Sequence, residues 1–230
     1  MLKTTPAESV ELVRRLLTAA AAKSADVAAQ LHPAWLDSVW QRMHLPMPRP
    51  PASATQSAAL ARIYGLRWTS LARFANQPER VALLPRLQML RVLAAIALHL
   101  ERDRVRHSIS RGARTALIDA VGEAAYVGIL AMPPLDRSGS SSNSFITSEI
   151  DLEQLAERGF AAIYELLDWN SRTTLMWVRL ALAPRHVAPP RKATASDTAH
   201  ALKRLAIYFP EHSWLFGSHM DRTLSDLKPA

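Results

Sequence analysis

Residues 85–100 read PRLQMLRVLAAIALHL, and they give the strongest indication of the fold in this sequence. Its apolar residues fall almost all round a helix rather than on one stripe, which is typical of a helix covered by neighbours on several sides. The pattern ends abruptly at the charged run ERDRVRH, residues 101–107. We therefore expect a buried central helix at about residues 86–100.

Further helices are expected around this one. The chain has only 7 glycines, its 15 prolines lie mostly between apolar-periodic segments, and runs of alternating β-branched and aromatic residues are missing. These features favour helices separated by proline stops. The predicted fold class is all-α, an irregular multi-helix single domain, with helices at about residues 5–22, 33–43, 58–76, 86–100, 111–130, 148–167, 171–182 and 197–208.

Four single residues add detail to these helices. Gly65 is expected to interrupt the apolar pattern of residues 58–76, because glycine is a poor helix former. Ser148 and Asn170 are predicted N-caps, because their side chains can accept a bond from a free N–H of the first helical turn. Gly159 lies among the apolar positions of its helix, and its missing side chain lets another helix approach closely.

The chain is expected to have three parts. Residues 1–32 form an Ala-rich N-terminal helix that is loosely attached, residues 33–184 form the helical core, and residues 185–230 form a C-terminal helix and tail. Within the core, the proline-rich residues 45–51 are interpreted as a semi-rigid linker, and residues 136–147 as a mobile surface loop rich in serine.

The composition limits the classes of protein to which this chain can belong. Its 230 residues hold 28 Lys and Arg against 20 Asp and Glu, a net charge of +8 with a pI of about 10.4. Cysteine is absent, which excludes disulfide scaffolds, thiolate zinc sites and cysteine nucleophiles. The sequence indicates neither a signal peptide nor a transmembrane helix, so we expect the protein to stay inside the cell.

Motifs that carry chemistry are missing. The chain holds no G-x-S-x-G elbow, no phosphate-binding G-x-x-x-x-G-K-[ST] loop, no G-x-G-x-x-G fingerprint and no H-E-x-x-H pair. His99 and His107 are two helical turns apart, too far to share one metal ion. His212, His219 and Asp221 match no metal-ligand spacing. The sequence therefore predicts no catalytic residue, no cofactor and no metal site.

Charged residues gather in two places. Arg102, Arg106 and Arg111 belong to a basic cluster that follows the central helix, where a nucleic acid or a protein could dock and where plain solvation is the third reading. The helix at about residues 149–168 holds six acids and one base, and Glu153, Glu157 and Glu165 are among the acids. The six tryptophans mostly fall at apolar helical positions, which indicates core packing.

Two stretches resemble a known family when their order and spacing are taken together. The first runs from the sequence LLPRL at residues 83–87 through the apolar helix to Pro133, and the second spans residues 150–184 and closes with WVRLALAP. Together they resemble the SctK family of type III secretion systems, whose members are called YscK, PscK, MxiK or OrgA. The resemblance covers roughly residues 30–184.

This resemblance implies a non-enzymatic adaptor of the sorting platform of a bacterial injectisome. Such a protein links a SctQ-like pod protein to the cytoplasmic domain of a SctD-like inner-membrane ring protein, and so supports protein secretion and virulence. It would lie in the bacterial cytoplasm at the inner membrane, without membrane insertion, nucleic acid or cofactor. Each charged cluster is then a candidate surface for one partner, with Arg102, Arg106 and Arg111 on one side and Glu153, Glu157 and Glu165 on the other.

Two alternatives stay open. The net charge of +8 also suits a basic helical protein that binds nucleic acid or has a regulatory role, and such binding would weaken steeply as salt rises. A helical enzyme with an unrecognised site is the third reading, and it would need a concave pocket with perturbed titratable groups.

Overall fold

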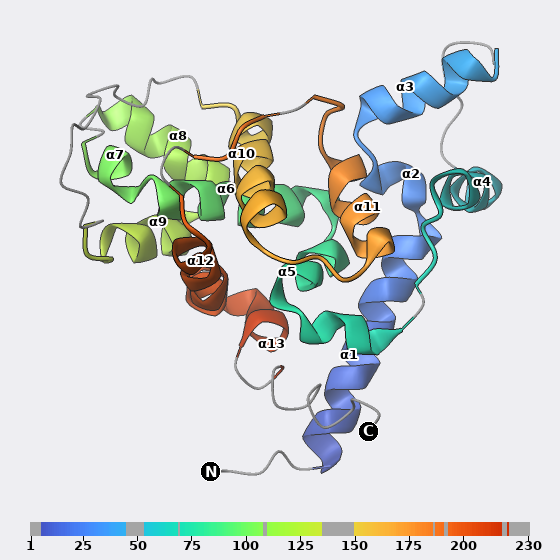
Figure 1. Ribbon diagram of the computed structural model, residues 1–230, viewed down its shortest axis with the longest axis horizontal. Coiled ribbons are helices and arrows are strands. Elements are labelled where there is room, and N and C mark those ends of the chain that lie inside the picture. Colours follow the sequence, from blue (N-terminus) through green and yellow to red (C-terminus); the bar gives the residue numbers. More distant parts are fainter. Residues whose placement is uncertain are drawn as a thin grey trace. The chain divides into compact units, whose positions relative to one another are not determined.

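The computed structural model describes residues 6–44, 53–68, 70–107, 110–134, 150–185, 187–190, 193–217 and 220. Within these ranges every regular element is a helix, which confirms the all-α class (Figure 1). The proline-rich linker, the loop at 136–147 and the predicted cap Ser148 lie outside the described residues. The proposed division at residues 32 and 184 stays a prediction.

The chain forms two compact units, each built from segments that are distant in sequence. Unit 1 comprises residues 1–89, 168–185 and 217–230, and unit 2 comprises residues 90–167 and 186–216.

Unit 1 is assembled from the N-terminal helices and one late helix. Helix α1 packs against α2, α4 and the short helix η2, and α11 also packs against η2. The elements of unit 1 are α1 (Pro6–Ala25), α2 (Val27–Gln30), α3 (Pro33–Arg42), α4 (Ala54–Tyr64), η1 (Leu71–Ala75), α5 (Gln77–Arg80), η2 (Val81–Leu83) and α11 (Arg172–Ala181).

Helix α4 shows how local sequence sets the boundaries in unit 1. Ser53 caps its start by accepting from the N–H of Gln56, and the Gln56 side chain accepts from the N–H of Ser53 in return, a reciprocal capping box. Gly65 ends the helix with φ +67, a left-handed conformation that favours glycine. The predicted interruption at Gly65 is confirmed. The expected helix at 58–76 starts earlier than predicted, and a separate 3₁₀ turn, η1, follows the interruption.

Unit 2 surrounds the C-terminal part of the central helix. Helix α12 packs against α9, α10 and α13, while α7 and α8 pack against α9 (Figure 1). The elements are α6 (Arg86–Leu100, from Leu90 onward), α7 (Arg102–Arg106), α8 (Arg111–Val121), α9 (Glu123–Leu130), α10 (Leu152–Leu166), α12 (Ala195–Tyr208), η3 (Pro210–His212) and α13 (Ser213–Phe216).

Helix α6 is the buried central helix that the sequence predicts. All nine residues from Val92 to Leu100 are buried. Gly159 of α10 sits directly on it: a Cβ atom added to Gly159 would lie 1.9 Å from the Leu93 carbonyl oxygen. Only glycine allows this approach. The predicted close contact at Gly159 is confirmed, and its partner is α6.

Three details of the predicted helices, one break and two N-caps, are wrong. The apolar pattern at 111–130 is two helices rather than one, because Gly122 separates α8 from α9 with φ +89. Ser171, rather than Asn170, caps α11 by accepting from the N–H of Thr174. Asp151, three residues after the predicted cap Ser148, caps α10 by accepting from the N–H of Glu153.

Candidate interaction surfaces and buried polar clusters

Arg102 and Arg106 both bind carbonyl groups near the end of α9. Arg102 is 6% exposed, and its Nε donates to the Pro133 carbonyl at 2.7 Å. Arg106 donates to the Leu130 carbonyl at 3.1 Å and pairs with Asp103 at 3.2 Å. Burial lowers the pKa of Arg102. These two guanidinium groups therefore hold α7 against the C-terminal end of α9.

Arg111 occupies a different environment, because it is the first residue of α8 and is exposed. Arg114 is also exposed, and its guanidinium lies 5.8 Å from the centre of the Tyr126 ring, within the range of a cation–π contact. Of the three basic residues predicted as a docking surface, Arg111 is the one that solvent reaches freely, while Arg106 is partly exposed.

The three glutamates of helix α10 that were predicted to face a partner differ in their exposure to solvent. Glu165 is exposed, Glu153 is half-buried, and Glu157 is only 3% exposed. The one base of this helix, Arg158, pairs with the buried Glu101 at the end of α6. Glu101 also pairs with Arg104 at 3.1 Å. Because Arg158 is engaged with Glu101, it does not neutralise the acids that α10 shows to solvent.

A second polar cluster lies deeper in unit 2, around His99 of α6. His99 is fully buried, and its Nδ1 lies 2.6 Å from the hydroxyl oxygen of Tyr208. The His200 ring meets it edge-on at 5.5 Å between ring centres. Burial lowers the pKa of His99 to about 3, and the positive charges of Arg102 and Arg204 add to the effect, while Asp197 opposes it. The imidazole is therefore neutral at physiological pH, and its hydrogen bond with Tyr208 connects α6 to α12.

Unit 1 buries a lysine beneath two stacked tryptophans. Lys23 of α1 is 3% exposed and donates to the Leu84 carbonyl at 2.6 Å. Its Nζ lies 5.3 Å from the centre of the Trp177 ring, which stacks on Trp68 at 5.4 Å. Burial lowers the pKa of Lys23 well below its ordinary value. The sequence contains a signal for this site, because Lys23 continues the buried stripe of Leu12, Leu16 and Ala20 at helical spacing.

A buried carboxylate joins α5 to the start of α11 in unit 1. Glu79 is fully buried, and its two oxygens accept from the Asn170 N–H at 2.8 Å and the Thr174 hydroxyl at 3.0 Å. Asn76 adds a bond to the Asp168 carbonyl at 2.8 Å. These bonds connect residues almost a hundred positions apart, so the sequence offers no local sign of them.

The described residues contain no group of three His, Asp or Glu side chains placed to hold a metal ion. Of the three tail residues weighed as ligands, His212 is buried in η3, whereas His219 and Asp221 lie outside the described residues. None of the helices within the described ranges is long and apolar enough to cross a membrane.

Comparison with known protein families gives a match over most of the chain. The model of a family described as bacterial type III secretion protein (HrpB4) matches residues 14–211, most of the chain. No curated protein and no solved structure matches the chain.

Proposed function

Because the chain belongs to the HrpB4 family of bacterial type III secretion proteins, we propose that it is a non-enzymatic adaptor of the secretion apparatus. In this proposal it corresponds to the SctK proteins that residues 83–133 and 150–184 resemble. It links a SctQ-like pod protein to the cytoplasmic domain of a SctD-like ring protein at the cytoplasmic face of the inner membrane.

The family match is the observation that carries this proposal, since it covers residues 14–211 and the family is one of secretion proteins rather than enzymes. The contacts in unit 2 support it. An adaptor needs two separate surfaces, and opposite charges orient each encounter. Arg111 on α8 and Glu165 on α10 are the exposed members of the two predicted charged sets, so a partner reaches these two directly.

In this proposal the other four predicted residues mainly stabilise the surfaces that carry Arg111 and Glu165. Arg102 and Arg106 hold α7 in place through the Pro133 and Leu130 carbonyls. Glu157 is buried and Glu153 is half-buried within α10. Removing one of these side chains would disturb the surface that carries Arg111 or Glu165.

Co-purification tests the proposal. The tagged full-length chain is co-expressed with the pod protein and the ring protein's cytoplasmic domain from the same genome, then captured after nuclease treatment at moderate salt. We expect both partners to be retained. Arg111→Glu and Glu165→Lys should each reduce recovery of one partner and leave the other, because each reverses one exposed charge. Lys203→Glu, an exposed reversal on α12, is the matched control and should leave both.

Recovery of neither partner contradicts the adaptor proposal. The second candidate, nucleic-acid binding, is favoured by the distribution of charge, because unit 1 holds 16 Lys and Arg against 8 Asp and Glu while unit 2 holds 12 of each. It predicts nucleic acid on the captured chain that nuclease removes, and binding whose logarithm falls steeply with the logarithm of salt concentration.

A further inference from the structure

Helix α1 has a second face that unit 1 does not bury. Its inward face is formed by Leu12, Leu16 and Ala20, each less than 8% exposed. On the other side Val10 is 69% exposed and Leu17 is 54% exposed. These two residues are seven positions apart, which is almost two full turns, so they lie on one line along the helix.

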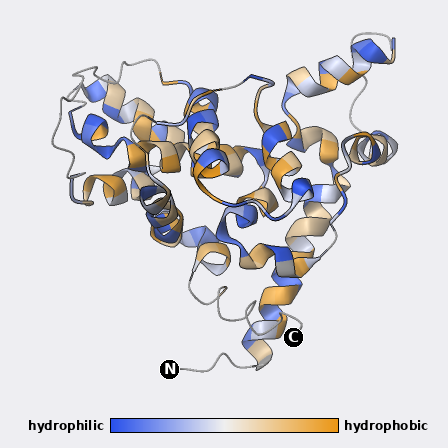
Figure 2. Ribbon diagram, in the orientation of Figure 1, coloured by the Kyte–Doolittle hydropathy of each residue, from blue (hydrophilic) through white to orange (hydrophobic). Residues whose placement is uncertain are grey.

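Exposed Ala21 extends this line by one more turn, and exposed Arg14 lies between the two apolar side chains. We call these four residues, Val10, Arg14, Leu17 and Ala21, the α1 stripe. Single exposed apolar residues are ordinary on protein surfaces, whereas a repeat at helical spacing is typical of a helix that packs on a partner. Figure 2 shows the mixed hydropathy of α1.

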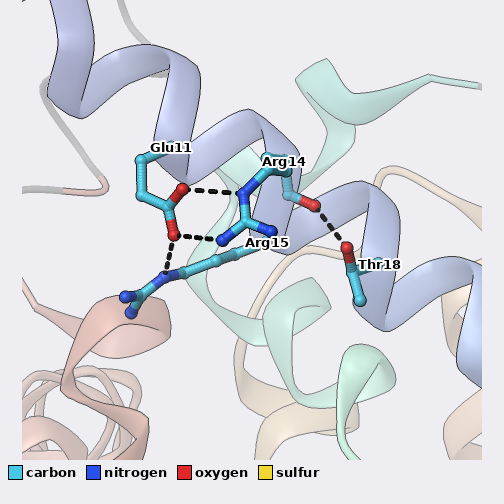
Figure 3. Close-up of polar contacts among 4 residues, drawn as sticks. All are labelled: Glu11, Arg14, Arg15 and Thr18. Carbon is cyan, nitrogen blue, oxygen red and sulfur yellow. Dashed lines mark hydrogen bonds and ion pairs between the residues drawn. The ribbon is translucent and has the colours of Figure 1, made fainter.

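Arg14 of the stripe and its neighbour Arg15 share one carboxylate, that of Glu11 (Figure 3). Glu11 accepts from Arg14 at 2.8 and 2.9 Å and from Arg15 at 2.8 Å. The Arg14 and Arg15 hydrogen bonds lower the pKa of Glu11 to about 2, so it stays ionised. The Arg14 and Arg15 side chains are 70% and 51% exposed. One carboxylate for two guanidinium groups leaves a net positive charge in this cluster beside Val10 and Leu17.

The charge of unit 1 as a whole also favours an acidic partner. Unit 1 carries the whole net charge of the protein, +8, while the charges of unit 2 cancel. Several described arginines of unit 1 are exposed, namely Arg14, Arg15, Arg42, Arg62, Arg67 and Arg73. A partner that docks on unit 1 should therefore be acidic, because complementary charge speeds and orients association.

We propose that the α1 stripe docks an acidic amphipathic helix of another protein. Its apolar side chains, spaced three and four residues apart, pack against Val10 and Leu17, and its carboxylates pair with Arg14 and Arg15. The contact spans about three helical turns, or roughly 16 Å. This surface lies in unit 1 and shares no residue with the surfaces of unit 2 that carry the adaptor proposal.

Charge and hydropathy favour this occupant over two others. A second copy of this chain, related by a two-fold axis that sets Val10 against Leu17, would bring the Arg14 residues of both copies together, and like charges repel. A nucleic acid would use the arginines but leave the apolar side chains of Val10 and Leu17 in water.

The test uses designed three-heptad peptides and the full-length chain. The acidic peptide has leucine at positions a and d and glutamate at e and g, and the neutral peptide replaces each glutamate by glutamine. Binding is measured by fluorescence anisotropy. We expect the acidic peptide to bind about tenfold more tightly, with the difference shrinking as salt rises.

Two variants locate the binding. Leu17→Ser and Arg14→Gln should each weaken binding of the acidic peptide severalfold. Because both side chains are exposed, the circular dichroism and urea midpoint of each variant should match those of the wild type. Ile207→Ser is the matched control. Ile207 of α12 is 52% exposed, an exposed fraction similar to the 54% of Leu17, and its loss should leave the binding unchanged.

Three kinds of result would overturn the proposal. The first is equal binding of the acidic and neutral peptides, or binding that Leu17→Ser leaves intact. The second is self-association of the wild-type chain in sedimentation that Leu17→Ser abolishes, which assigns the stripe to a second copy. The third is nucleic-acid binding that Arg14→Gln weakens while neither peptide binds. The adaptor proposal is tested separately through Arg111 and Glu165.

Discussion

Substituting Gly159 by alanine should destabilise unit 2 strongly. The added Cβ would lie 1.9 Å from the Leu93 carbonyl oxygen and 2.7 Å from its carbonyl carbon, whereas ordinary contact begins at 3.4 Å. The two helices would have to separate by about 1.5 Å. The obstacle is backbone rather than a flexible side chain, so no change of rotamer relieves it.

The size of the effect follows from two opposing terms. Overpacking of this severity costs about 3 kcal/mol or more. The higher helix propensity of alanine relative to glycine stabilises the folded state by up to about 1 kcal/mol. We therefore expect a net loss of at least about 2 kcal/mol in the free energy of unfolding, or about 4–8 °C in the melting temperature of a chain of this size.

Urea unfolding followed by far-ultraviolet circular dichroism measures this loss. Gly112→Ala on α8 is the matched control, because a Cβ at Gly112 would meet nothing within 4 Å. Its stability should stay unchanged or rise by less than about 1 kcal/mol. If Gly159→Ala unfolds at the same urea concentration as Gly112→Ala, the close packing of α10 on α6 is refuted.

Two further predictions concern buried ionisable groups. Folding lowers the pKa of His99 from 6.5 to about 3, so its contribution to stability is complete above pH 6.5 and is lost as the pH falls toward 3. Between pH 7 and pH 5 this loss amounts to about 2 kcal/mol in urea unfolding, and His99→Gln should lack it; an equal drop in the variant would contradict the assignment. Because burial also depresses the pKa of Lys23, wild-type stability should rise as the pH increases from 7 toward 10, and Lys23→Met should abolish that rise while keeping the packing on Trp177. A rise of the same size in Lys23→Met would show that Lys23 is not its source.

Hydrophobic periodicity was sufficient to predict the helices whose buried faces can be recognised from residues close together in the sequence. Helix α6 was predicted because its apolar residues surround the helix axis, and α12 begins and ends within two residues of the expected positions. Gly159 was predicted as a point of close approach because it lies among the apolar positions of α10. In each case neighbours three or four residues apart carry the information.

The polar interior could not be predicted in the same way. Arg102 and Glu157 read as surface charges, yet both are buried, since the partners of a side chain come from elements distant in sequence. The Glu79 carboxylate meets Asn170 and Thr174 more than ninety residues away. The division into two units is equally non-local, because each unit combines separate stretches of the chain.

Reconstitution from three purified proteins tests the adaptor role. The purified chain is mixed with the SctQ-like pod protein and the SctD-like cytoplasmic domain and analysed by size-exclusion chromatography with light scattering. The proposal predicts one species that contains all three proteins, with the pod protein and the ring domain failing to associate when the chain is left out. Competition of the two partners for the chain, or their association without it, would contradict the proposal.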